Sequence, residues 1–88
     1  MGDYKPRPNV VVTWTGEHLE ILSTSGERGP HGKRFFGVDR CAARLKRRGF
    51  RIERTGAPGR QLAVPVTDEA RAAVLQEFKV GEPVEAAF

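Results

Sequence analysis

The sequence predicts a small, single α+β domain, and three observations support this fold class. The chain has 88 residues, which suffices for one domain with one thin hydrophobic core. Apolar residues recur at helical spacing over residues 38–48, and they alternate with charged residues over 50–54. We therefore expect one basic α+β domain at residues 10–80, between a flexible tail at 1–9 and a frayed end at 81–88.

The domain begins with a strand, because Val10–Trp14 is rich in β-branched and aromatic residues. Residues 16–24 then fit two interpretations. Thr15 can cap a short helix that carries Leu19 and Leu22 on one face, and we expect this helix because the apolar residues do not alternate cleanly. The alternative is a hairpin turn that starts at Thr15, after which the chain returns as a second strand.

The strongest helical pattern covers residues 38–48 and follows a glycine-rich loop at 25–37. Gly49 comes directly after this pattern and supplies the left-handed conformation that commonly ends a helix. The apolar residues are spaced i, i+3, i+4, i+7, so we expect them to share the buried face of the helix. They are Val38, Cys41, Ala42 and Leu45.

Two strands and a second helix are predicted after this helix. Residues 50–54 and 61–66 have strand patterns, and the glycine- and proline-containing segment 55–60 joins them as a turn. Thr67 precedes two acidic residues, which is typical of a capped helix N-terminus. The predicted buried stripe of the second helix consists of Ala70, Ala73, Val74 and Phe78.

Basic residues are concentrated in the centre of the sequence. Residues 28–60 hold eleven lysines and arginines but only two acids, a net charge of +9, whereas the rest of the chain has a net charge of −5. This asymmetry indicates a surface for a polyanion. We predict that nucleic acid is bound by all eleven cations: Arg28, Lys33, Arg34, Arg40, Arg44, Lys46, Arg47, Arg48, Arg51, Arg54 and Arg60.

The order helix, glycine, strand, turn, strand and capped helix resembles the second half of a winged helix-turn-helix domain. Residues 39–50 resemble its recognition helix and the exit from it, and residues 51–66 would form the wing. The resemblance covers residues 38–79. A winged helix also has a helix just before its recognition helix, and residues 30–36 are too short and glycine-rich for one. A ββαββα sandwich fits the same order of elements.

The resemblance implies binding of double-stranded DNA by occupancy, as expected for a small phage-like or bacterial transcription regulator. Three arginines of the helix would face the major groove, and Ala43 between them would permit a close approach. They are Arg40, Arg44 and Arg47. Arg54 and Arg60 would flank the wing tip and contact the DNA backbone or the minor groove. Cations before the helix would contact phosphates: Arg28, Lys33 and Arg34.

A second class of function uses the same basic face. A protein-binding factor or inhibitor would pair these arginines with carboxylates of a larger protein, and the acidic ends of the chain favour this alternative because they would repel DNA. A homodimer is also compatible with the sequence, through a patch of Leu75, Phe78 and Phe88. No apolar run is long enough for a membrane span, and the lone cysteine suggests a reducing, cytoplasmic location.

No motif for catalysis or for a cofactor is found, so we do not expect an enzyme. The segment from Gly26 to Lys33 lacks the phosphate-binding loop pattern, because Glu27 occupies the first glycine position and Arg34 the hydroxyl position. His18 and His31 do not form a metal-binding spacing with the single cysteine. We accordingly expect neither a metal nor an organic cofactor.

Overall fold

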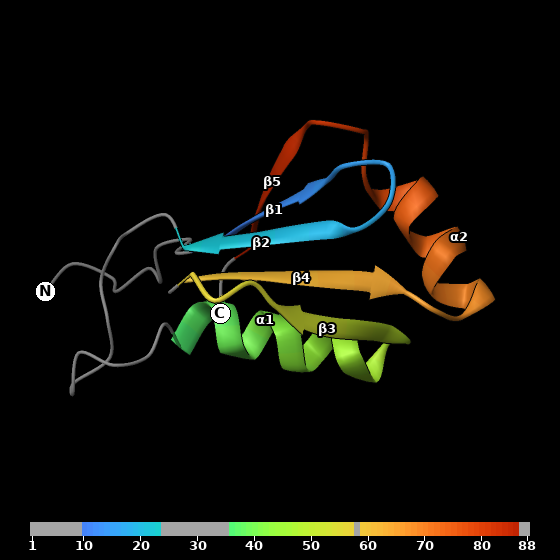
Figure 1. Ribbon diagram of the computed structural model, residues 1–88. Helices are drawn as coiled ribbons and strands as arrows, with labels where there is room; N and C mark the ends of the chain where they lie inside the picture. The colour runs from blue at the N-terminus through green and yellow to red at the C-terminus, as the bar shows by residue number, and fades with distance from the viewer. Residues whose placement is uncertain (1–9, 24–35, 58, 87–88) are drawn as a thin grey trace, which may run out of the picture.

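The computed structural model describes residues 10–23, 36–57 and 59–86. It is an α+β domain, as the sequence predicts, and the described residues form a five-stranded antiparallel sheet and two helices (Figure 1). The strand order in the sheet is β3-β4-β2-β1-β5. In chain order, the elements are β1 (Val10–Trp14), β2 (Leu19–Ser23), α1 (Phe36–Arg47), β3 (Phe50–Arg54), β4 (Arg60–Pro65), α2 (Asp68–Glu77) and β5 (Pro83–Ala86).

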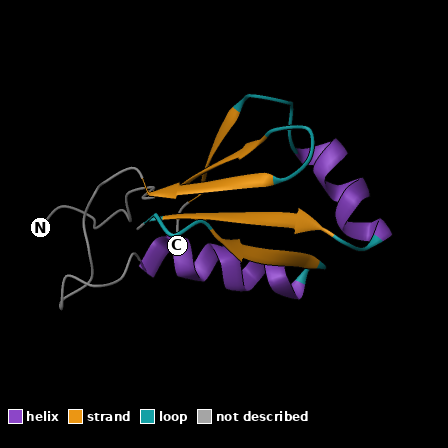
Figure 2. Cartoon of the chain, in the orientation of Figure 1, coloured by secondary structure: helices purple, strands orange, loops and turns teal. Residues whose placement is uncertain are grey.

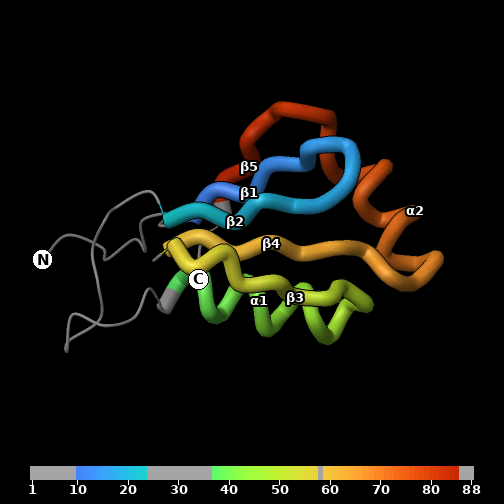
Figure 3. Tube along the Cα trace, viewed as in Figure 1, coloured from blue at the N-terminus to red at the C-terminus, as the bar shows by residue number. Residues whose placement is uncertain are grey.

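The sheet is built from two hairpins that lie side by side. The β1–β2 and β3–β4 hairpins join through antiparallel pairing of β2 with β4 (Figure 3). Helix α1 covers one face of the sheet, and α2 lies at one end of it (Figure 2). The order from β1 to α2 is ββαββα, the alternative that the sequence left open. The additional helix of a winged helix-turn-helix would lie within residues 24–35, outside the described residues.

The expected helix at residues 16–24 is wrong, because this segment turns and returns as β2. Gly16 has a positive φ of 102°, and the backbone N–H of Thr15 donates to the carbonyl of His18 over 3.0 Å. Leu19 and Ile21 are fully buried, while the residues between and after them are only partly buried. Pairing with both β1 and β4 outweighs the weak local helical preference, since the short segment buries two large side chains as a strand.

The end of the chain also differs from expectation. Residues 83–86, which we expected to fray, form β5 and pair with β1. Gly81 adopts a positive φ of 79°, and its N–H donates to the carbonyl of Trp14 over 2.7 Å. The turn at Gly81 therefore returns the chain to the sheet, where β5 occupies the otherwise open edge of β1.

The predicted apolar face of α1 forms the centre of the core. All four of its residues are buried against the sheet, together with side chains from β1, β2, β3 and β4. From the predicted stripe of α2, Ala70 and Val74 are buried in the same core, whereas Ala73 and Phe78 are only partly buried. One continuous core thus holds α1 at a defined position on the sheet, with its opposite face directed outward.

Gly49 and Thr67 join the two helices to the sheet. Gly49 has a φ of 95° and ends α1, as predicted. Thr67 caps α2, because its Oγ1 accepts a hydrogen bond of 3.1 Å from the N–H of Ala70. The two residues touch, and a Cβ on Gly49 would collide with the Thr67 side chain. The position therefore requires glycine both for its φ and for its space.

Candidate nucleic-acid interface

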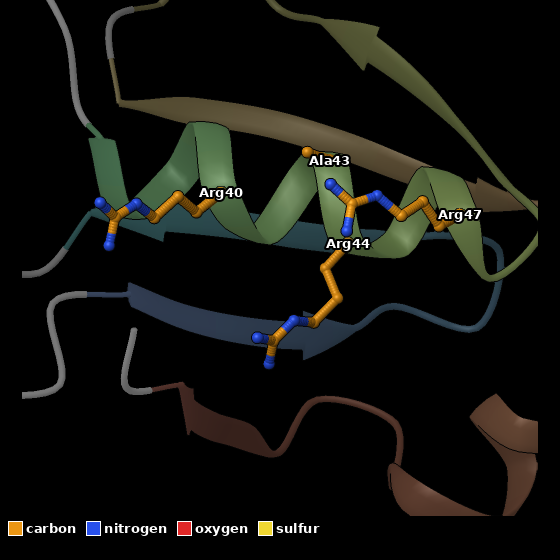
Figure 4. Close-up of a pocket in the computed structure, with 4 residues that line it drawn as sticks. All are labelled: Arg40, Ala43, Arg44 and Arg47. Carbon is orange, nitrogen blue, oxygen red and sulfur yellow. The ribbon is translucent and has the colours of Figure 1, made fainter.

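The outer face of α1 carries the central part of the predicted site. Helical periodicity places one set of residues opposite the buried stripe, where they are exposed and line an open hollow of about 250 Å³. The set consists of Arg40, Ala43, Arg44 and Arg47 (Figure 4). We call this surface the α1 outer face. The sequence predicted that these residues lie together, because positions i, i+3, i+4 and i+7 share one side of a helix.

The three arginines spread around a small centre. In Figure 4, Arg40 extends toward the N-terminal end of α1, Arg44 extends to the side, and Arg47 runs back along the helix toward Ala43. Arg40 and Arg47 are seven residues apart, which corresponds to about 10 Å along a helix axis. Ala43 contributes only a methyl group to the centre of this face, beside the Arg47 side chain (Figure 4).

Two of these arginines have no acidic partner in the described part of the chain. Neither Arg40 nor Arg47 forms an ion pair with an acid of residues 10–23, 36–57 or 59–86. Asp39 is the acid nearest to them in the helix sequence, and its Oδ1 accepts a hydrogen bond of 3.0 Å from Nε2 of Gln61 on β4. This acid is therefore directed to the sheet, and the α1 outer face keeps a positive character.

Three other predicted cations are paired with carboxylates. The pairs are Arg48 with Glu77 at 3.2 Å, Arg51 with Glu53 at 2.9 Å, and Arg60 with Glu20 at 2.8 Å. A carboxylate within hydrogen-bond distance offsets most of the guanidinium charge toward a distant polyanion. These arginines contribute less to an anion-binding surface than their number in the sequence indicates.

The ion-paired arginines of the β3–β4 hairpin also lie on the sheet face that is turned away from α1. Arg51 is opposite Val64, and Arg60 is opposite Leu22, in a register where Phe50, Ile52 and Ala63 face α1. Because side chains alternate along a strand, Arg51 and Arg60 belong to the face that is turned away from α1. We call this face, with Glu20 and Glu53, the second sheet face.

The remaining predicted cations are distributed over three places. Arg54 alternates with Phe50 and Ile52, so it lies on the same side of the sheet as α1, near the end of β3. Lys46 is exposed at the flank of α1. Three predicted cations lie outside the described residues: Arg28, Lys33 and Arg34. The structure thus brings together the arginines of α1, and separates them from Arg51 and Arg60.

The single cysteine is a core residue. Cys41 lies on the buried face of α1, and burial raises the pKa of its thiol from 9.0 to about 11, against a smaller lowering by the charge of Arg44. The thiol is therefore protonated at neutral pH and is a poor nucleophile. Within the residues that the structure describes, no three His, Cys, Asp or Glu side chains gather into a group that could hold a metal ion.

The carboxylates that pair with the arginines were not anticipated. Arg51 and Glu53 are two residues apart on one strand, so they share a sheet face, and this spacing could have indicated their ion pair. Glu20 and Glu77 are 40 and 29 residues distant from their partners, and no local pattern connects them. Only strand order and helix placement bring these carboxylates to Arg60 and Arg48.

In the described part of the chain, neither helix is long and apolar enough to span a membrane. Comparisons with protein-family models, with curated proteins and with solved structures found no match for this chain.

Proposed function

We propose that this protein is a binding module for double-stranded nucleic acid, with DNA as the favoured ligand, and that the α1 outer face makes the contact. The observation that carries the proposal is the exposed set of Arg40, Arg44 and Arg47 around Ala43. Arg40 and Arg47 have no carboxylate partner among the described residues. The module acts by occupancy, since binding alone is what such a surface does.

The chemistry of the contact follows from the guanidinium group. It carries a permanent positive charge and a planar fork of donors, which pairs with phosphate oxygens or with the O6 and N7 edge of guanine. The major groove of B-DNA is about 12 Å wide and admits one α-helix. Inserted side-on, α1 would place Ala43 against the groove floor while the arginines reach the bases and the two flanking backbones.

The winged-helix mode is the more specific form of this proposal. In that mode, the turn between β3 and β4 contacts the DNA beside the helix. Arg54 supports this mode, because it lies at the entrance of the turn and on the α1 side of the sheet. Arg60 supports it less, since it is bound to Glu20 on the second sheet face. We therefore assign the wing contact to Arg54.

Fluorescence anisotropy with a labelled random duplex of about 30 base pairs, over a series of salt concentrations, tests the proposal. We expect affinity to fall steeply with salt, because bound cations release counterions from the DNA. The variant Arg40→Ala/Arg44→Ala/Arg47→Ala should lose most of the binding. If all three side chains contact phosphates, the slope of log K against log salt should decrease in magnitude by roughly 2–3.

The matched control removes three positive charges elsewhere. In Arg51→Gln/Arg71→Gln/Lys79→Gln, the changed residues are exposed and lie outside the α1 outer face. This variant has the same net charge as the alanine variant, so retained binding would assign the effect to position and not to total charge. Equal losses in both variants would contradict a specific interface. Absence of binding at low salt would exclude the nucleic-acid function and leave the α1 outer face as a docking site for an acidic protein surface.

A further inference from the structure

We propose that β3 is a homodimerisation edge, through which two copies of this chain join their sheets into one antiparallel sheet. Strand β3 stands at one end of the strand order in the described sheet, so one of its two edges has no neighbouring strand there. Helix α1 packs across β3, β4 and β2 on one face of the sheet, and it adds no strand to this edge. The inference goes beyond the proposed function and does not depend on it.

The hydrogen bonding within the hairpin shows which groups face outward. The N–H of Val66 donates to the carbonyl of Gly49 over 3.0 Å, in the register that continues along β3 and β4. Bonded and non-bonded pairs alternate along an antiparallel ladder, so the bonded pairs that follow are those of Arg51 and Glu53 with β4. The N–H and C=O groups of the alternate residues then point to the free edge: Phe50, Ile52 and Arg54.

Pro65 supports this assignment. It is opposite Phe50, and a proline has no N–H to donate to that residue. A non-bonded pair is the position where the missing donor costs the β3–β4 ladder nothing. The three outward-facing residues of β3 therefore offer three donors and three acceptors to another strand.

Charge complementarity selects a second copy of β3 as that strand. In an antiparallel pair centred on Ile52, the two copies of Ile52 are opposite one another, and Arg51 of each copy is opposite Glu53 of the other. Both residues are exposed on the second sheet face, with side-chain exposures of 63% for Arg51 and 45% for Glu53. Non-bonded pairs of this kind bring side chains closest together, so each dimer would gain two opposite-charge contacts.

The competing registers are unfavourable. Only registers that align the outward-facing residues can form the ladder, and the nearest alternatives are shifted by two residues. One alternative places Arg51 opposite Arg51 of the second copy, and the other places Glu53 opposite Glu53. Like charges directly opposite each other destabilise a strand pair. Charges usually protect a free edge from pairing, but here their opposite signs favour one symmetric pairing.

Sedimentation velocity between about 10 μM and 1 mM protein, at moderate salt and without nucleic acid, tests the proposal. We expect a reversible monomer–dimer equilibrium in the parent chain. Arg51→Glu alone and Glu53→Arg alone should each raise the dissociation constant by about tenfold, because each places like charges opposite each other twice per dimer. The double variant Arg51→Glu/Glu53→Arg restores the complementarity and should dimerise like the parent.

Mixing the two single variants provides a control within the same experiment. One chain then carries two acids and the other two bases at positions 51 and 53, so the mixture should form a heterodimer that neither chain matches alone. Both positions are exposed, and circular dichroism of each variant should match the parent. A chain that stays monomeric at about 1 mM would overturn the proposal. A dimer whose dissociation constant is unchanged by both single charge reversals would also overturn it. So would a dimer that is lost on Leu75→Asp, because Leu75 is 76% exposed on α2 and is not part of the β3 edge.

Discussion

The α1 outer face and the second sheet face both carry arginines, but they differ in the carboxylate partners that the described residues supply. On the second sheet face, Arg51 and Arg60 each contact a glutamate within 3 Å. On the α1 outer face, Arg40 and Arg47 have no such partner in the described part of the chain. The same residue type thus forms ion pairs on the second sheet face, and on the α1 outer face we propose that it serves contact with an anion.

The difference has a geometric origin. A strand places every second residue on one face and brings a neighbouring strand within about 5 Å, so Arg51 meets Glu53 and Arg60 meets Glu20. A helix exposes a face with no such neighbour, and the one acid in α1 is bound to Gln61 of the sheet. In this chain, the cluster of cations in the sequence therefore overstates the positive surface where the cluster runs through β3 and β4.

Gly49 lies between α1 and β3, and its replacement should have the largest effect of the changes considered, a loss of folding stability. We expect Gly49→Ala to lower the free energy of unfolding by about 2–4 kcal/mol, because a Cβ is strained at a φ of 95° and collides with Thr67. Urea denaturation followed by circular dichroism measures this change. Gly56→Ala is the matched control, since its φ is 81° with no atom near the added Cβ, and it should cost only about 1 kcal/mol. Equal losses in the two variants would show that the contact with Thr67 does not matter.

A carboxylate placed among the arginines should remove the distinction between the two faces. We expect Ala43→Glu to weaken duplex binding by about tenfold or more at low salt, because it would pair with the arginines one turn away and repel phosphates. The helix itself should not be destabilised, since the new pairs are favourable. Ala72→Glu introduces the same change at an exposed position of α2 and should leave affinity nearly unchanged. The salt series with the 30-base-pair duplex compares them, and unaltered binding of Ala43→Glu would place the contact elsewhere.

Removing the carboxylates of the second sheet face is the converse test. Glu20→Gln/Glu53→Gln releases Arg60 and Arg51 from their ion pairs and keeps the side-chain shapes. Because both arginines lie opposite to α1, we expect a gain in duplex affinity of only about two- to threefold, from the higher net charge. A gain of tenfold or more would show that the second sheet face itself takes part in binding.

The smallest expected effect concerns the core cysteine. The pKa of the Cys41 thiol is raised from 9.0 to about 11 in the folded chain, so the unfolded chain loses this proton at lower pH. The contribution of Cys41 to stability is therefore full below pH 9 and is lost as the pH rises through 11. Urea denaturation at intervals across this range should show a steeper decline for the parent than for Cys41→Ala. Identical declines would indicate that the thiol titrates equally in both states.

Several elements followed directly from short-range patterns. The helix around Cys41, the glycine that ends it, and the hydroxyl cap at Thr67 are all found where the residues predict them. Each depends on contacts within about four residues, through helical periodicity, a left-handed φ or a capping hydrogen bond. The gathering of Arg40, Arg44 and Arg47 on one face belongs to this group, because helical spacing alone produces it.

Other features could not be predicted from local residues. The return of β2 and the addition of β5 depend on pairing with β1 across the sheet, so a weak helical preference at Leu19 and the expected fraying at Pro83 were misleading. The wing cations were predicted as one surface with α1, yet strand register turns Arg51 and Arg60 to the opposite face. A shift of one residue in register would have reversed this placement.

By itself, the sequence determined the existence of the central helix, the glycine that ends it, and the side of the helix on which its arginines lie. These features depend on dihedral preferences and hydrogen bonds between near neighbours in the chain. Only the tertiary structure decided which arginines have a carboxylate partner distant in the sequence, because Glu20 and Glu77 reach Arg60 and Arg48 through strand order and helix placement. Ion pairing depends on distance in space, and the fold sets that distance for residues far apart in the sequence.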